Sequence, residues 1–201
     1  MKKNNDPQNL VHPFNWFVPE NATTLIIGTF PPVEKRWGFE FFYPNLQNNF
    51  WTILSKIAGT TLSTDKNVMV TERQHLLKKL KTGITDMGAI IKRLSPDSKD
   101  ESLEIVKYME ILQILRDHPS VKKIILTSSS GKSSALGWFK GYLEKNNIAH
   151  VVPKGIKPLR FDIQFKNRTI EVHVLYSPSR RAANRISFEN LVEMYKNVIM
   201  Q

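Results

Sequence analysis

The 201-residue sequence contains no cysteine. This absence excludes disulfides, thiolate ligands for a metal ion and a cysteine nucleophile. The sequence also has no run of 18 apolar residues, and its polar start, MKKNNDPQNL, has no apolar signal core. We therefore expect no association with a membrane and a cytoplasmic location. Internal repeats and low-complexity linkers are absent too, which favours a single domain.

Several catalytic motifs are missing as well. The five histidines, at positions 12, 75, 118, 150 and 173, show no spacing typical of metal ligands. No Gly-x-Ser-x-Gly elbow of a serine hydrolase occurs. The segment SSSGKSS at 128–134 is similar to the end of a phosphate-binding loop, but Leu126 stands where that motif requires glycine. We therefore expect no metal, no cofactor and no nucleoside triphosphate site.

Charge is the first positive signal in the sequence. Lysine and arginine total 29 against 18 aspartate and glutamate residues, which gives a formal net charge of +11. Such an excess favours a polyanionic partner, most often a nucleic acid, although a basic protein without such a partner is the plain alternative.

Strand and helix patterns alternate along the chain and predict an α/β fold. The sequence favours a single domain at 23–201, a three-layer α/β/α sandwich with a mainly parallel, four- to five-stranded sheet. Residues 1–22 are expected to form an arm that packs on this body. Expected strands are 23–28, a short one from 83 that turns at Asp86, 121–127, 148–152, 161–165 and 168–175. Expected helices are 49–59, 71–81, 103–116, 133–146 and 187–200, and residues 92–101 are expected to form a polar loop.

Two loops follow buried strands and carry unusual composition. The first, within LIIGTFPPVEKRWGFEFFYPNLQNNFW at 25–51, is rich in aromatic residues and asparagine. The second, YSPSRRAANR at 176–185, is basic. Because ligands bind beyond the carboxyl ends of parallel strands, both loops should face one crevice. A planar, uncharged group such as a nucleobase would suit it.

The order and spacing of three blocks resemble the uracil-DNA glycosylase superfamily. The blocks are LIIGTFPP at 25–32, YPNLQNNFW at 43–51 and VLYSPSRRAAN at 174–184. The likeness spans residues 23–198 and is greatest to the hypoxanthine-removing branch, with the mismatch-specific uracil branch next. The resemblance implies a monomeric enzyme that flips a damaged base out of DNA. The resemblance further implies that the enzyme hydrolyses the N-glycosidic bond as its single activity, without metal or cofactor.

The resemblance also implies catalytic residues. Asn48 matches the asparagine before Phe-Trp, which places water in the hypoxanthine branch. Asn49 is the alternative because the loop is two residues longer than usual, and Asn48 could instead cap the helix that follows it. Asp86 lies in the central family segment, where it could orient water, bind the base or cap a helix.

The base-binding residues implied by the resemblance lie in all three blocks. Gly28, Thr29 and Phe30 form the first turn, where several branches carry a polar water-placing residue. Phe41 aligns with a base-stacking aromatic residue, with Phe42 as its competitor, although core packing would explain either. Ser177 stands where relatives often carry His or Asn to stabilise the leaving base.

The DNA contacts are expected from two loops. Arg181 occupies the position of the residue that fills the gap left by the flipped base. The other expected contacts are Ser130, Lys132, Pro178, Ser179, Arg180 and Asn184. The replacements at Phe30 and Ser177 leave open a catalytically weakened or inactive nucleic-acid-binding protein of the same fold. A hydrolase acting on RNA or free nucleotides is a third possibility.

Overall fold

The structure is a computed structural model in which residues 9–95, 102–180 and 184–201 are described. Its strands are β1 (Asn9–Val11), β2 (Thr24–Gly28), β3 (Thr82–Asp86), β4 (Gly88–Arg93), β5 (Leu103–Tyr108), β6 (Lys123–Leu126), β7 (Leu159–Phe165) and β8 (Arg168–Val174). Its helices are α1 (Phe50–Ala58), α2 (Met69–Lys79), α3 (Ile111–Asp117), α4 (Ala135–Lys145) and α5 (Phe188–Ile199), besides a short 3-10 turn, η1 (Glu34–Arg36).

A five-stranded sheet forms the centre of the fold, with strand order β3-β2-β6-β8-β7. All neighbouring pairs are parallel except β7 with β8, which is antiparallel. The expected α/β fold with a mainly parallel central sheet is therefore confirmed. The carboxyl ends of the four parallel strands meet at one edge of this sheet.

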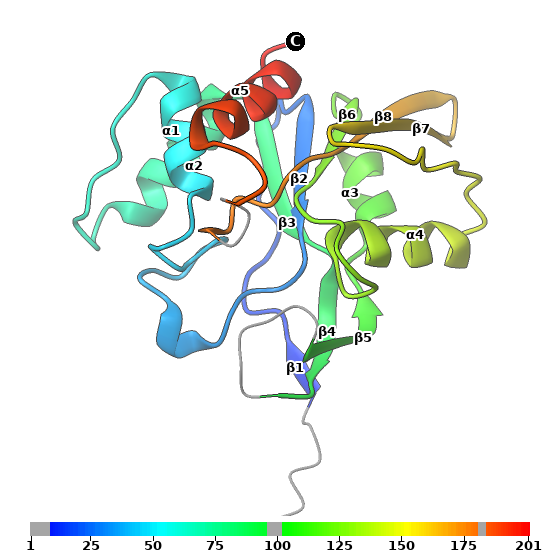
Figure 1. Cartoon of the computed structure of the whole chain (residues 1–201), viewed down its shortest axis with the longest axis horizontal. Coiled ribbons are helices and arrows are strands. Elements are labelled where there is room, and N and C mark those ends of the chain that lie inside the picture. The colour runs from blue at the N-terminus through cyan, green and yellow to red at the C-terminus, as the bar shows by residue number, and fades with distance from the viewer. Residues whose placement is uncertain (1–8, 96–101, 181–183) are drawn as a thin grey trace, which may run out of the picture.

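Helices cover both faces of the central sheet, α1, α2 and α5 on one side and α3 and α4 on the other (Figure 1). The strand sequences explain this arrangement. In β2, Leu25 and Ile27 join the core cluster beneath α3 and α4, whereas Ile26 joins the cluster beneath α1, α2 and α5. A strand with several consecutive apolar residues can bury both faces, as parallel sheets require.

Local signals place most helix ends correctly. Gly59 follows α1 in the left-handed conformation with φ of 60°, which glycine adopts without steric cost. The hydroxyl oxygens of Ser134 and Ser187 accept hydrogen bonds from the backbone amides of Gly137 and Asn190 at the starts of α4 and α5. Among these described helices, none is long and apolar enough to cross a membrane.

The helix expected at 103–116 is wrong in its first half. Residues 103–108 form β5, and only Ile111–Asp117 is helical. β5 pairs with β4, and β4 with β1, in a three-stranded antiparallel sheet. The sequence interpretation missed β4 and this sheet, because pairing with residues distant in the chain outweighed the helical spacing of residues 103–116. The small sheet projects beyond the carboxyl edge of the central sheet (Figure 1).

The strand expected at 148–152 is also wrong. This segment has no regular secondary structure, and Val151 is 82% exposed. The central sheet ends instead at β7, which pairs with β8 along its whole length. A stretch of five residues, four of them apolar, is too short a signal by itself to specify a strand.

The segment before β2 runs along the edge of the central sheet. Phe17 and Ile84 of β3 exchange backbone hydrogen bonds of 3.0 and 2.8 Å. Phe14 and Phe17 pack against the core cluster beneath α1, whereas Trp16 is 38% exposed. The division of the chain into an arm at 1–22 and one domain stays a prediction, and residues 1–8 lie outside the described part.

Candidate active site

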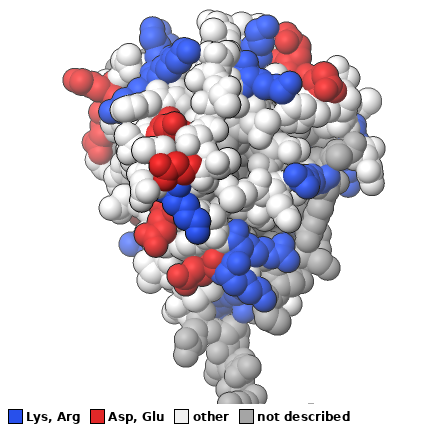
Figure 2. Space-filling model, turned by 90° about the vertical axis from the view of Figure 1, so that its left-hand side faces the viewer, with Lys and Arg blue, Asp and Glu red and all other residues white. Residues whose placement is uncertain are grey.

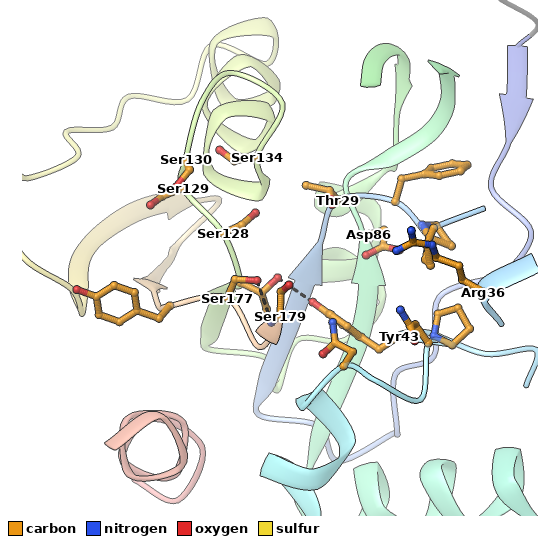
Figure 3. A pocket seen from close by; sticks show the side chains of 18 of the residues that line it. Thr29, Arg36, Tyr43, Asp86, Ser128, Ser129, Ser130, Ser134, Ser177 and Ser179 are labelled. Carbon is orange, nitrogen blue, oxygen red and sulfur yellow. Dashed lines mark hydrogen bonds between the residues drawn. The ribbon is translucent and has the colours of Figure 1, made fainter. Parts of the chain in front are cut away.

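A cavity of about 430 Å³ lies at the carboxyl edge of the central sheet. Thr29, Tyr43 and Asp86 lie on one side, Ser128, Ser129, Ser130 and Ser134 on the other, and Ser177 and Ser179 between them (Figure 3). Among the described residues that line it, Asp86 is the one acid, and Arg36, Lys157 and Arg185 are the bases. The lining is therefore mostly neutral hydroxyl and amide groups, with ring faces from Phe30, Tyr43 and Tyr176.

The two loops singled out in the sequence both line this cavity, as expected. They are joined directly, because the backbone amide of Asn49 donates a hydrogen bond of 3.1 Å to the carbonyl oxygen of Pro178. The Ser177 hydroxyl oxygen accepts a hydrogen bond of 3.2 Å from the amide of Ser179. Pro178 itself is buried and does not line the cavity.

The turn after β2 is fixed by hydrogen bonds to the backbone carbonyl oxygens of four of its residues. The carbonyl oxygens of Gly28 and Thr29 accept from the amides of Met87 and Gly88. Those of Pro31 and Pro32 accept from Arg93 Nη2 at 3.0 Å and from the Trp37 indole at 2.8 Å. The two prolines add fixed φ angles, so the turn is a rigid floor for the cavity.

Gly28 is required by close approach. A Cβ atom at this position would overlap with Oδ1 of Asp86 and lie 3.0 Å from the hydroxyl of Tyr43. Gly28 itself does not line the cavity, whereas Thr29 and Phe30 do. Glycine therefore serves to let the Asp86 and Tyr43 side chains approach the backbone.

Asn48 lines the cavity and Asn49 does not. Oδ1 of Asn48 accepts a hydrogen bond of 2.9 Å from the amide of Phe50, in the first turn of α1. Asn49 is the N-cap residue of α1 but its side chain accepts no capping hydrogen bond. Asn48 therefore accepts a hydrogen bond at the start of α1, as the capping alternative expects. This bond uses one lone pair of Oδ1 and leaves the second lone pair out of it.

Asp86, at the end of β3, lines the cavity and contacts a residue that the sequence interpretation missed. Its Oδ2 lies 3.0 Å from Nε2 of His12, and both side chains are buried, at 8% and 2% exposure. Lone histidines are most often structural, and nothing in the sequence connected His12 with Asp86. The aspartate does not cap a helix, because a strand both precedes and follows it.

Phe41 and Phe42 do not line the cavity, which corrects the expected stacking role. They are 6% and 0% exposed in the core beneath α1, where Phe41 stacks on Trp51 with ring centroids 5.9 Å apart. Core packing, the alternative already open in the sequence, explains both. Tyr43 reaches the cavity instead, with its ring stacked on Phe50 at 3.8 Å and its hydroxyl 2.7 Å from Oγ1 of Thr127.

The serine loop between β6 and α4 mostly satisfies its own helix. Ser128 accepts from the amide of Ala135 through its hydroxyl oxygen and from Leu136 through its carbonyl oxygen, at 2.9 and 3.0 Å. The Ser134 hydroxyl oxygen accepts from Gly137 at 3.1 Å. Because the first amides of α4 are already bonded, this helix end is not an open phosphate site of the P-loop kind.

Positive charge lies beside the serine loop and beside the loop after β8. Nη1 of Arg185 donates to the hydroxyl of Ser130 over 3.4 Å. Nζ of Lys157 lies 4.8 Å from the ring centre of Tyr176. Burial, and secondarily the charge of Arg185, lower the pKa of Lys157 from its ordinary value.

The remaining expected DNA contacts lie outside the cavity lining. Lys132, Arg180 and Asn184 are exposed residues of the same two loops. Arg181 lies outside the described residues. Figure 2 shows Lys and Arg in separate groups on the face formed by α1, α2 and α5, with Asp and Glu between them. In the part of the chain that the structure describes, no three His, Asp or Glu side chains group to hold a metal ion.

Comparison with solved structures identifies the fold. The chain is similar to the solution NMR structure of a "putative Uracil DNA glycosylase" from Methanosarcina acetivorans, with a TM-score of 0.62 and 18% sequence identity. The match covers 96% of this chain and 97% of that one. No family model matches the sequence, and no curated protein matches it either. The two proteins therefore share a fold over almost their whole length.

Proposed function

We propose that the protein is a DNA glycosylase of the uracil-DNA glycosylase superfamily, nearest to its hypoxanthine-removing and mismatch-specific branches. It flips a deaminated base, hypoxanthine or uracil, out of DNA and hydrolyses the N-glycosidic bond. The cavity carries this proposal. Its volume of about 430 Å³ lies in the range of small-ligand pockets, and its neutral polar lining suits an uncharged heterocycle. The shared fold and the net charge of +11 support the same conclusion.

The chemistry of the reaction assigns a role to each wall. Cleavage builds positive charge on the sugar and negative charge on the departing base. Asn48, held by Phe50, places the attacking water through the free lone pair of Oδ1. The Asp86 carboxylate stabilises the positive sugar, and the hydroxyls of Thr29 and Ser177 donate to the base. Phe30 and Tyr43 provide the ring faces beside the base, in place of Phe41 and Phe42.

DNA is held at the rim in this scheme. Lys157, Arg185 and the Ser130 hydroxyl contact backbone phosphates, together with Ser179 and the exposed Lys132 and Arg180. We further propose that the enzyme acts as a monomer, with one activity and without a metal ion, in the cytoplasm. Water is then the only nucleophile that the reaction needs.

The test is a panel of duplexes that each carry one hypoxanthine, uracil or xanthine, incubated with excess protein at low salt and then treated with alkali. We expect strand cleavage at one or more of these bases. The variant Asn48→Ala should lose about 10²–10³-fold in excision rate and keep its affinity for DNA. Asn49→Ala is the matched control and should keep its rate, because its side chain lies outside the cavity lining.

Absence of cleavage on every duplex would overturn the proposal. Retained DNA binding would then favour the non-catalytic nucleic-acid-binding alternative, which the residues Phe30 and Ser177 leave open. Stronger competition by single-stranded RNA or nucleosides than by duplex DNA would favour the third possibility, a hydrolase acting on RNA or free nucleotides.

A further inference from the structure

We propose that His12 is a positioning residue that acts on the reaction through Asp86. The N-terminal segment thereby completes the active site, although it does not line the cavity. This inference rests on the proposed glycosylase function and adds to it a residue from outside the three sequence blocks.

The contact between the two residues is close and shielded. Nε2 of His12 lies 3.0 Å from Oδ2 of Asp86, with the side chains 2% and 8% exposed. Nδ1 of the same ring lies 2.7 Å from the carbonyl oxygen of Phe14. Both ring nitrogens are therefore engaged, and the imidazole bridges the N-terminal segment and the end of β3.

The hydrogen-bonding capacities of the groups determine how this bridge works. The backbone amide of Phe14 donates to Nδ1 over 3.1 Å, so this nitrogen accepts a hydrogen bond. A carboxylate oxygen also accepts, so Nε2 carries the hydrogen of the bond to Oδ2. This bond holds Oδ2 in place, as histidine–carboxylate pairs do around other reactive groups.

The second carboxylate oxygen is constrained from the opposite side. Oδ1 of Asp86 occupies the space where a side chain at position 28 would lie, and Gly28 leaves that space open. His12 and Gly28 together therefore determine the orientation of the carboxyl group. Because Asp86 is the acid among the described cavity residues, its orientation decides where negative charge lies relative to the sugar.

His12 is held through both its backbone and its ring. Its backbone amide donates to the carbonyl oxygen of Ala89 over 2.9 Å, which extends the pairing of β1 with β4. The rings of Phe14, Phe30 and Phe42 pack around it, with centroid distances of 5.8, 5.2 and 5.6 Å. Phe30 also lines the cavity, so the packing is continuous from the N-terminal segment to the site.

Burial of such a pair adds little to the free energy of unfolding by itself. Well-packed apolar side chains in place of a buried polar pair are often equally stable or more so. The pair therefore serves orientation. In the hydrolysis, the oxygen of water bonds to the sugar carbon and the carbon–nitrogen bond breaks, with its electron pair leaving on the base. One proton of the water moves to Asp86 and then to the base. A carboxylate with a fixed orientation accepts this proton at a set distance.

A double-mutant cycle between His12 and Asp86 tests the inference, with single-turnover excision and DNA affinity as readouts. His12→Phe keeps an aromatic ring among its three neighbours and removes both nitrogens. We expect it to lower the excision rate about 10–100-fold, as loss of orienting partners typically does, and to change the DNA dissociation constant less than about twofold. His12→Gln, which retains a donor, should recover part of the rate. In an Asp86→Asn background, His12→Phe should have no further effect.

Three results would overturn the inference. The rate of His12→Phe could equal that of the wild type, its effect could multiply with that of Asp86→Asn, or its melting temperature could fall without any coupling to Asp86. If His12→Phe does not fold, the same cycle is run with His12→Leu. Wild-type protein that excises no base would instead reject the proposed function, so the two failures are distinguishable.

Discussion

The backbone amide of Asn49 donates a hydrogen bond of 3.1 Å to the carbonyl oxygen of Pro178. This bond joins the loop before α1 to the loop after β8, and both loops line the cavity. Because it uses backbone atoms, most side chains at these positions would preserve it. The position of Asn48 relative to Ser177 is therefore a property of the fold more than of either side chain.

Substitution of Gly28 should damage both stability and activity. In Gly28→Ala, the new methyl group would overlap with the Asp86 carboxyl group, which His12 holds on its other side. We expect a loss of about 1–3 kcal/mol in the free energy of unfolding, measured in urea, and a lower excision rate. Gly59→Ala is the control. Nothing lies within 4 Å of its Cβ position, so only the left-handed backbone is strained, and excision should be unaffected.

Removal of the Tyr43 hydroxyl should cost stability but little activity. Tyr43→Phe loses the 2.7 Å hydrogen bond to Thr127 and keeps the ring stacked on Phe50. We expect unfolding to become easier by about 0.5–1.5 kcal/mol, with an excision rate within about threefold of wild type. Tyr43→Leu, which also loses the ring, should reduce excision further. Equal rates for the two variants would contradict a role for the ring beside the base.

Lys157 should bind DNA through its charge. We expect Lys157→Gln to weaken DNA binding and to reduce the slope of log affinity against log salt by about one. Burial and Arg185 lower the pKa of Lys157, so the free protein loses this charge at lower pH than an ordinary lysine would. DNA affinity of the wild type should therefore fall earlier on going to alkaline pH than that of Lys157→Arg. Fluorescence anisotropy with a lesion-free duplex measures both effects.

The same lowered pKa predicts a stability trend. The unfolded chain binds the Lys157 proton more tightly than the folded protein does, so the free energy of unfolding should rise with pH between the two pKa values. Lys157→Gln should lack this part of the rise. Urea denaturation without DNA, at matched ionic strength across the alkaline range, measures the difference between the two proteins. Identical profiles would contradict the prediction.

Two serines of one loop should separate stability from DNA binding. Ser134→Ala removes the cap of α4 and should lower the free energy of unfolding by about 1 kcal/mol, with little change in DNA affinity. Ser130→Ala should do the reverse, because Ser130 is exposed beside Arg185 and caps no helix. Parallel urea denaturation and DNA titration of both variants test this. A large loss of affinity in Ser134→Ala alone would indicate that the helix end binds phosphate after all.

Much of the central fold could be predicted because its signals are local. β2 is apolar at successive positions and contributes to cores on both faces of the sheet, so its burial is visible in the sequence. The serines that cap α4 and α5 and the glycine after α1 act within a few residues of the helix ends. Such signals do not depend on the rest of the chain.

The small sheet and the identity of the aromatic residue that lines the cavity could not be predicted in this way. The apolar residues of 103–116 have spacing compatible with a helix, but β5 forms because β4 is available to pair with it. Phe41, Phe42 and Tyr43 are consecutive aromatic residues with similar burial preferences. Which of them faces the cavity depends on the backbone at Tyr43, where φ is 50°.

The sequence by itself determined the layered α/β fold, the two loops that meet at the carboxyl edge of the sheet, and Asn48 and Asp86 as candidates for the chemistry. Only the tertiary structure decided that Tyr43 lines the cavity in place of Phe41 and Phe42, and that His12 contacts Asp86. The physical reason is the distance in the sequence over which each signal acts. Burial periodicity and helix caps depend on a few neighbouring residues. The 3.0 Å contact between His12 and Asp86 instead depends on pairing of the N-terminal segment with the edge of the sheet.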